Sequence, residues 1–347
     1  YPEVSGKSAR EEAERLRKLA SDGADLKTIK DQAKVKPTFK EAAEDWYSRK
    51  VAEGLAPKTL RLMRDALDKD MLPAIGSKAL ESVTRAECTQ LQSKIEGRGA
   101  WHIAKKARGW MNQIFSLAIA QGKCDLNPAS ELRHVAKKAP QTQNHPHLHE
   151  PELPDFLNAL SRSNSMYPTR VAVYMILLTA SRPGMVRWAE WSEVDLDEQM
   201  WTIPGPKMKK RRDHLVPLPD QLIPLLRNLE EITGRGRYLY PGVKSNAVLS
   251  HTTVNAVLSN AGYKGKLTGH GSRHTASTLL REHGWRKDYV EMQLSHVEQG
   301  VAGVYNKAQY LKQRQVMMQW YSDYLDALKR GISEQDKEDF AKRVIKG

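Results

Sequence analysis

The chain contains 347 residues, which is enough for two domains, and 40% of them are hydrophobic, which is adequate for a core in each. Lys and Arg total 55 against 41 Asp and Glu, and the formal charge of +14 suits a polyanionic partner, with a solubilising surface as the plainer alternative. The two cysteines, Cys88 and Cys124, show neither disulfide nor metal-site spacing, and no apolar run approaches the roughly 20 residues that span a bilayer. A disulfide scaffold and a membrane protein are therefore excluded, and we expect a cytoplasmic protein.

The first 36 residues are expected to hold one helix, at residues 7–20, followed by a polar connector. A helix of this size has too little to pack against to be a domain by itself. Because the chain starts with Tyr1 and shows no signal peptide, we interpret this segment as the end of an upstream module of a longer protein.

Residues 37–135 have helical periodicity throughout. Four helices are predicted, at residues 39–54, 57–71, 85–96 and 100–121. Thr84 and Glu87 have the spacing of a capping box before the third helix, and Gly122 ends the fourth. Basic side chains on this bundle could face a nucleic-acid backbone, although charge on an amphipathic helix is as often its solvated face. They are Lys58, Arg61, Arg64, Arg85, Lys105, Lys106 and Arg108.

Residues 136–150, AKKAPQTQNHPHLHE, have the Pro, Gln and Asn content of an interdomain linker. His145, His147 and His149 alternate within it, which makes a zinc site conceivable. No Cys or fourth ligand stands at a fixed spacing, so the linker interpretation is preferred and no metal is expected.

Residues 151–330 have a mixed pattern. Residues 171–179 are apolar all round, which predicts a buried helix. Residues 199–204 and 214–218 read as strands joined by a basic hairpin tip. Further helices are predicted at residues 220–233, 251–262 and 311–328. Residues 331–347 are polar and are expected to fray.

Five short motifs in this second part carry reactive side chains. The buried helix ends in TASRPGM, the hairpin contains KMKKRRDHLVPL, and HGSRHTASTLL is followed by QLSH and VYNKAQYL. Histidine transfers protons near neutral pH, arginine binds phosphate oxygens in pairs, and tyrosine can be a nucleophile, so together they suit attack on a phosphodiester. Taken singly, each histidine or tyrosine is more often a packing residue.

These motifs, in this order and spacing, resemble the tyrosine recombinases, and among them the integrases of prophages and genomic islands. That family has patterns like TGxRPGE, MKxRRxHxVPL and HxxR, and a His or Trp nine residues before the nucleophilic tyrosine. The opening YPEVSGKSAR is also similar to the end of the amino-terminal arm-binding domain of this subgroup. Matched residue by residue, the resemblance implies a catalytic set of Arg182, Lys209, His270, Arg273, His296 and Tyr305.

The resemblance implies a mainly α protein with a small β-sheet or hairpin in its catalytic domain. It implies five segments: 1–36 as the remnant of the arm-binding domain, 37–135 as a helical core-binding domain, 136–150 as linker, 151–330 as a mixed α+β catalytic domain and 331–347 as a polar tail. Strand cleavage would proceed through a 3′-phosphotyrosyl intermediate, with no metal or cofactor. His270 would accept the tyrosine proton, and Lys209 would protonate the leaving 5′ oxygen.

The implied partners are double-stranded DNA attachment sites, other copies of the chain in a homotetramer on paired sites, and accessory proteins for excision of a mobile element, all at the bacterial nucleoid. Hairpin residues expected to contact DNA are Lys207, Lys210, Arg211 and Arg212. Two alternatives stay open: a type IB topoisomerase, which shares the chemistry, and a DNA-binding regulator on an inactive scaffold.

This chain departs from the family pattern at two positions near the first arginine. Ala180 stands in place of a glycine, which is a small change. Met185 stands where an acidic residue is common, so Glu190 or Glu193 is the hypothetical brace for Arg182. Tyr310 is the rival of Tyr305 as nucleophile, and the nine-residue step from His296 favours Tyr305.

Overall fold

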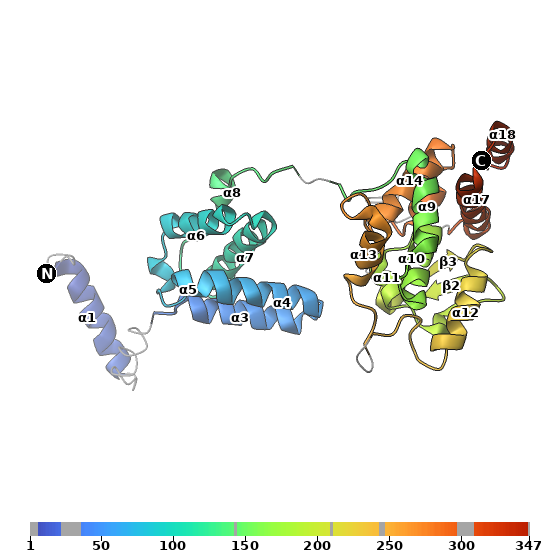
Figure 1. Cartoon of the computed structure of the whole chain (residues 1–347). Helices are drawn as coiled ribbons and strands as arrows, with labels where there is room; N and C mark the ends of the chain where they lie inside the picture. Colours follow the sequence, from blue (N-terminus) through green and yellow to red (C-terminus); the bar gives the residue numbers. More distant parts are fainter. Residues whose placement is uncertain are drawn as a thin grey trace. The chain divides into compact units, whose positions relative to one another are not determined.

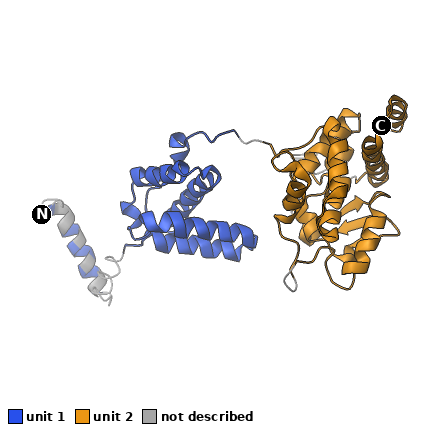
Figure 2. Ribbon diagram, viewed as in Figure 1, with its two compact units in different colours: residues 1–142 blue, residues 143–347 orange. Residues whose placement is uncertain are grey.

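The computed structural model describes residues 6–21, 36–141, 144–208, 211–242, 247–296 and 309–345. The chain divides into two compact units, residues 1–142 and residues 143–347 (Figure 2). The structure is mostly helical with one small antiparallel sheet, which confirms the predicted fold class. None of the helices in the described ranges is long and apolar enough to cross a membrane.

The first unit is a bundle of helices, after a separate helix α1 (Gly6–Ser21). Its members are α3 (Phe39–Ala52), α4 (Pro57–Ala66), α5 (Leu72–Ile75), α6 (Arg85–Gly97), α7 (Trp101–Ala120) and α8 (Leu132–Val135). A π-helical turn (Leu67–Met71) joins α4 to α5, so the run predicted to end at residue 71 continues to Ile75. The predicted capping box of Thr84 and Glu87 is present.

Aromatic side chains fill the core of this bundle because α3 and α7 each place them on their inner faces. The ring of Phe39 lies 5.4 Å from that of Phe115, and the ring of Trp46 lies 6.4 Å from that of Trp110. Such tilted pairs add to the free energy gained by burying the rings.

The second unit is organised around α10 (Tyr167–Thr179), labelled in Figure 1. Its residues 171–173 and 175–179 are buried. The predicted buried helix is therefore confirmed. The other helices of this unit are α9 (Leu153–Arg162), α11 (Pro183–Arg187), α12 (Ile223–Thr233), α13 (Thr253–Leu258), α14 (Gly271–Glu282), α15 (Lys287–Gln293), α17 (Leu311–Arg330) and α18 (Glu334–Lys342). Of these, α12, α13, α14 and α17 pack against α10.

The sheet has the order β1–β2–β3, and both pairings are antiparallel. Its strands are β1 (Val194–Asp195), β2 (Met200–Ile203) and β3 (His214–Pro217), and the register pairs Trp201 with Val216. The two predicted strands are confirmed, whereas β1 is too short to have a sequence signature. The β2–β3 connection is the basic segment noted above.

The end of the second unit differs from its expected frayed state. Ser333 and Asp336 form a capping box at the start of α18. Phe340 on this helix stacks edge-on against Trp320 and Tyr324 of α17. One aromatic anchor and one cap thus order a segment whose composition is otherwise polar.

Candidate active site

The first arginine of the site follows directly from the way α10 ends. Ala180 adopts the left-handed conformation, with φ of 50°, and this turn ends the helix and redirects the chain into Arg182. The Arg182 guanidinium donates a hydrogen bond to the Ser295 carbonyl at 3.1 Å. Burial lowers the pKa of Arg182 from its ordinary value.

The second arginine, Arg273, comes from the first turns of α14 and is 7% exposed. It donates to the carbonyl of Ala180 and, at 2.7 Å, to that of Leu294. Burial and then the charge of Arg182 lower the pKa of Arg273 to about 9. Within the described residues neither guanidinium bonds a carboxylate, so the two charges remain available to an anion.

His296 completes the group that faces these guanidiniums. Its Nε2 lies 3.4 Å from Arg273 Nη2, and its Nδ1 lies 2.7 Å from a carboxylate oxygen of Glu291. A carboxylate accepts hydrogen bonds only, so Nδ1 carries the proton in this pair and Glu291 fixes the orientation of the ring. Glu291 is itself paired with Arg281. The sequence did not indicate Glu291 as a partner.

His270 stands at the start of α14, against residues of the segment predicted as linker. Its ring stacks on that of His145 with centroids 5.0 Å apart. Partial desolvation lowers the pKa of His270, and the charges of His145, Arg273, Arg182 and His274 lower it further. The neutral ring that results can accept a proton.

Main-chain contacts hold this linker segment on α14. The Pro146 carbonyl accepts a hydrogen bond from the Thr268 amide, and Leu148 and Thr275 exchange two hydrogen bonds near 3.0 Å. A Cβ on Gly271 would lie 1.8 Å from the Pro146 oxygen, so only glycine allows this approach. In the part of the chain that the structure describes, no group of three or more His, Cys, Asp or Glu side chains is placed to hold a metal ion.

A buried arginine on α17 joins the segments that carry the site. Arg314 has no exposed surface, and it donates to Gln293 Oε1 at 2.8 and 3.0 Å and to the carbonyls of Leu215 and Gln309. Gln293 in turn donates to the Thr179 carbonyl at 2.8 Å. This node links the end of α10, strand β3, the end of α15 and the start of α17. Burial lowers the pKa of Arg314 to about 10.

The sequence reasoning missed Arg314 because a charged residue on an amphipathic helix is normally assigned to its solvated face. One signal was present: Arg314 lies three residues before the apolar Met317, and residues three apart share one face of a helix.

The structure brings Arg182, Arg273, His270 and His296 into one region of the second unit. The remaining predicted catalytic residues, Lys209 and Tyr305, lie outside the described residues, as does Lys210. The rival tyrosine, Tyr310, is described. It precedes α17 in the left-handed conformation, and its ring packs 5.1 Å from that of Tyr289.

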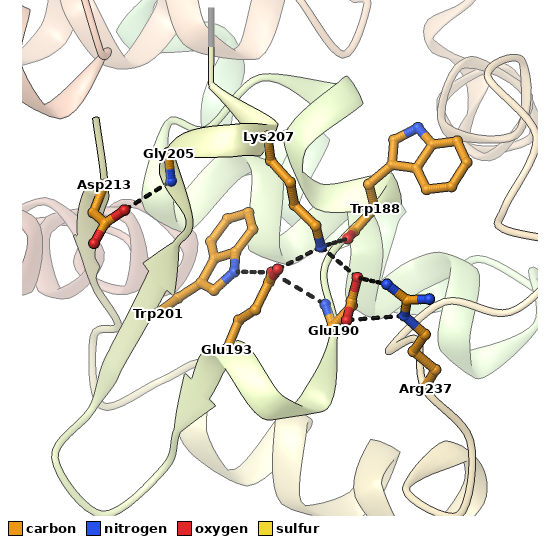
Figure 3. A network of polar contacts seen from close by, with 8 residues as sticks. All are labelled: Trp188, Glu190, Glu193, Trp201, Gly205, Lys207, Asp213 and Arg237. Atoms are coloured by element: carbon orange, nitrogen blue, oxygen red, sulfur yellow. Dashed lines mark hydrogen bonds and ion pairs between the residues drawn. The ribbon is translucent and has the colours of Figure 1, made fainter. Parts of the chain in front are cut away.

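The hypothesis that Glu190 or Glu193 braces Arg182 is wrong. Both carboxylates bind Lys207 instead (Figure 3), and Arg182 bonds a main-chain carbonyl. Met185 packs against the hydrophobic core, where its apolar side chain fits and a carboxylate would not.

The residues predicted to contact DNA fall into two groups by their contacts. Five of them form no ion pair with another described residue: Lys58, Arg61, Lys105, Arg211 and Arg212. Arg211 and Arg212 lie next to residues that the structure does not describe. Lys106 lies over the Trp110 ring at 5.8 Å. Arg64 bonds Glu44 and Asp68, and Lys207 bonds Glu190 and Glu193. The DNA contacts themselves stay predictions.

Comparison with known sequences shows that the chain belongs to the phage integrase family of tyrosine-type site-specific recombinases. Sequence models of the "Phage integrase central domain" and the "Phage integrase family" match residues 39–135 and 146–312. Among similar proteins, prophage integrase IntZ of Escherichia coli (strain K12) is 34% identical over 338 residues, covering 95% of this chain and 83% of that protein. The integrase of Shigella phage Sf6 is 33% identical, covering 94% of this chain and 85% of that protein.

Solved structures share the fold at lower identity. A lambda integrase dimer bound to a COC′ core site has a TM-score of 0.62 at 17% identity, covering 87% of this chain and 86% of that chain. A lambda integrase tetramer bound to a Holliday junction has a TM-score of 0.62 at 18% identity, covering 85% of this chain and 88% of that chain.

Proposed function

We propose that this recombinase cleaves and rejoins DNA strands at attachment sites through a 3′-phosphotyrosyl intermediate, and thereby integrates or excises a mobile element. The observation that carries the proposal is the pair of guanidiniums, Arg182 and Arg273, which main-chain carbonyls hold and to which no carboxylate in the described part of the chain bonds. Attack on a phosphodiester builds negative charge on the two non-bridging oxygens, and fixed cations at that position lower the barrier.

The proposed reaction assigns one role to each of the remaining groups. The Tyr305 oxygen attacks phosphorus, and its proton passes to neutral His270. The bond from phosphorus to the 5′ oxygen breaks, and the Lys209 ammonium gives that oxygen a proton. His296, oriented by Glu291 through Nδ1, donates a hydrogen bond from Nε2 to a phosphate oxygen in its doubly protonated form. The phosphoester is conserved, so a new 5′ hydroxyl can reverse the step without ATP.

The proposal extends to the partners of the chain. We expect Lys58 and Arg61 of α4, Lys105 and Lys106 of α7, and the β2–β3 loop to contact the phosphates of duplex DNA. We also propose a homotetramer on two paired duplexes. Solved relatives bound as a dimer to a core site and as a tetramer to a Holliday junction support both parts.

The test is covalent trapping on nicked duplexes that carry candidate attachment sequences from the borders of the mobile element. Wild-type protein should form an adduct that survives a denaturing gel, and peptide mapping should locate it at Tyr305. Tyr305→Phe should abolish the adduct and leave DNA affinity nearly unchanged, because only the nucleophilic oxygen is removed.

Tyr310→Phe is the matched control and should retain the adduct. An adduct that persists in Tyr305→Phe and disappears in Tyr310→Phe would move the nucleophile to Tyr310. Relaxation of supercoiled DNA by a monomer at sites without a partner would favour the topoisomerase alternative.

A further inference from the structure

Lys207 is a basic residue of the β2–β3 loop whose ammonium is enclosed by acceptors from an earlier part of the chain. Its Nζ lies 2.7 Å from Glu190 Oε1 and 2.8 Å from the Trp188 carbonyl, and it also bonds Glu193 (Figure 3). All three acceptors belong to the segment that follows α11, a few residues after Arg182. One side chain therefore ties the loop to the segment that delivers Arg182.

The two carboxylates around Lys207 have further partners that fix their positions. The Glu193 side chain is 5% exposed and accepts hydrogen bonds from the Trp201 indole and the Glu190 amide, each at 3.2 Å. Glu190 also pairs with Arg237 at 3.0 Å. Bonds from Arg237 and Lys207 hold the pKa of Glu190 at about 2, so this carboxylate is charged at neutral pH.

These contacts differ from those of a lysine that faces a phosphate backbone. Such a lysine keeps its ammonium in solvent and moves freely, whereas the Lys207 side chain is 28% exposed and has two carboxylates and a carbonyl as partners. Two cations, Lys207 and Arg237, balance the two carboxylates, so little net charge is left for DNA.

The loop is also closed at its base. The Gly205 amide donates to Asp213 Oδ1 at 2.7 Å, which joins the two ends of the loop (Figure 3). A Cβ on Gly205 would lie 2.7 Å from the Arg211 carbonyl oxygen, so glycine is required for this close approach. The base of the loop is thus closed and Lys207 is bound, so the described residue two positions before Lys209 is held in place.

We propose that Lys207 is a positioning residue for strand cleavage: by binding Glu190, Glu193 and the Trp188 carbonyl it docks the β2–β3 loop and sets the position from which Lys209 reaches the leaving oxygen. This inference rests on the proposed role of Lys209 as the acid. It assigns Lys207 a different role from the DNA contact predicted from its charge.

The leaving group provides a test specific to proton donation. In the natural substrate, cleavage releases the 5′ oxygen, which needs a proton as its bond to phosphorus breaks. In a duplex whose 5′ bridging oxygen at the cleavage site is replaced by sulfur, the same bond breaks to release a thiolate, and thiols have a pKa of only about 8.5. That substrate does not need an acid.

The experiment measures single-turnover cleavage of both substrates by the full chain. Lys207→Met should slow cleavage of the oxygen substrate by roughly 10²-fold, which is the lower end of the range for general acid catalysis. The rate at which this variant cleaves the sulfur substrate should stay within a few fold of the wild-type rate. Lys207→Arg should be much closer to wild type on oxygen, because it keeps a cation between the carboxylates. Arg227→Met, which removes an exposed cation paired with Asp197 in the same unit, should behave as wild type.

Glu193→Gln weakens the same contact from the other side and should show the same selective defect, which keeps the inference testable if Lys207→Met folds poorly. An equal loss on both substrates, or a loss of DNA affinity in Lys207→Met, would overturn the inference, as would unchanged cleavage. Lys209→Met separates the two proposals. If the sulfur substrate restores the cleavage rate of Lys209→Met but not that of Lys207→Met, only the inference about Lys207 fails. If it restores the rate of neither variant, the assignment of Lys209 as the acid fails.

Discussion

His270 shows how much of a catalytic role is set by neighbouring side chains. Partial desolvation of the ring and the charges of Arg273 and Arg182 favour its neutral form, as do His145 and His274 whenever they are protonated. A neutral imidazole is the form that a proton acceptor needs, so the surroundings of His270 match its proposed role.

The first prediction concerns the pH dependence of strand cleavage. The pKa of His270 lies below its ordinary value of 6.5, so cleavage should persist at pH 6.5 and fall about tenfold per pH unit only below that pKa, where the ring is protonated. His145→Gln removes one neighbour that lowers the pKa and should move this limb to higher pH. The measurement is kcat/KM for cleavage between pH 5 and 8, because it reports the free enzyme.

The matched control for this series is His251→Gln, which changes an exposed histidine and should leave the limb in place. A limb with its midpoint above pH 6.5 in wild type, or one unaltered in His270→Gln, would contradict the role given to His270.

The motifs predicted Arg182, His270, Arg273 and His296, since an ordered set of spacings identifies residues without any knowledge of the fold. The partners of these residues could not be predicted. Arg182 and Arg273 are held by main-chain carbonyls, whose direction depends on left-handed turns at Ala180 and Ser295 that have no distinctive composition.

At the level of elements, α17 does more than pack against the core. Its first turns carry Arg314, which bonds Gln293 and the Leu215 carbonyl while fully buried. A buried guanidinium is retained only where several acceptors compensate it. Here the acceptors come from β3, from α15 and from the chain just before α17, so these elements are held in register with one another.

The second prediction concerns how much the hydrogen bonds of Arg314 contribute to the stability of the protein. Arg314→Met leaves the Gln293 amide oxygen and the Leu215 carbonyl buried without their donor, which should lower the free energy of unfolding by about 2–4 kcal/mol. Urea denaturation of the full chain measures it. Lys312→Met changes an exposed residue of the same helix and should stay within about 0.5 kcal/mol of wild type. Equal stability of the two variants would show that the node is energetically neutral.

Helices and strands with a clear hydrophobic pattern in the sequence were predicted. Those that depend on contacts with distant parts of the chain were missed. The apolar run of α10 and the alternation of β2 and β3 were identified from sequence, whereas β1, with two residues, and α18, with one aromatic anchor, were not. Phe340 is stabilised by Trp320 and Tyr324, which are remote in sequence, so no local window contains that interaction.

For the whole molecule, the formal charge of +14 does not tell which of the cations a DNA duplex would meet. Part of the positive charge is neutralised within the protein, as at Arg64 with Glu44 and Asp68. Net charge alone cannot distinguish such residues from free ones, because pairing depends on the fold.

The third prediction uses this distinction. Binding to duplex DNA should weaken linearly in a plot of log affinity against log salt concentration, and Lys58→Gln or Arg61→Gln should each reduce the slope by about one, as expected for one lost phosphate contact. Arg64→Gln is the matched control on the same helix and should leave the slope unchanged, since two carboxylates already hold that guanidinium. A smaller slope in Arg64→Gln, with no change in the other two variants, would contradict the assignment.

The hydrogen bonds of Pro146 and Leu148 with residues around the start of α14 have a consequence for protein engineering. Composition assigns residues 145–149 to the linker, but their partners, together with Gly271, lie in the second unit. A chimera that joins the second unit of this chain to the first unit of a relative should therefore keep residues 144–150 with α14, and the fusion point belongs upstream of them. A fusion made at residue 151 would replace residues 145–149 with those of the relative. Residues from another protein would then lie against Gly271, and His270 would lose its contact with the His145 ring.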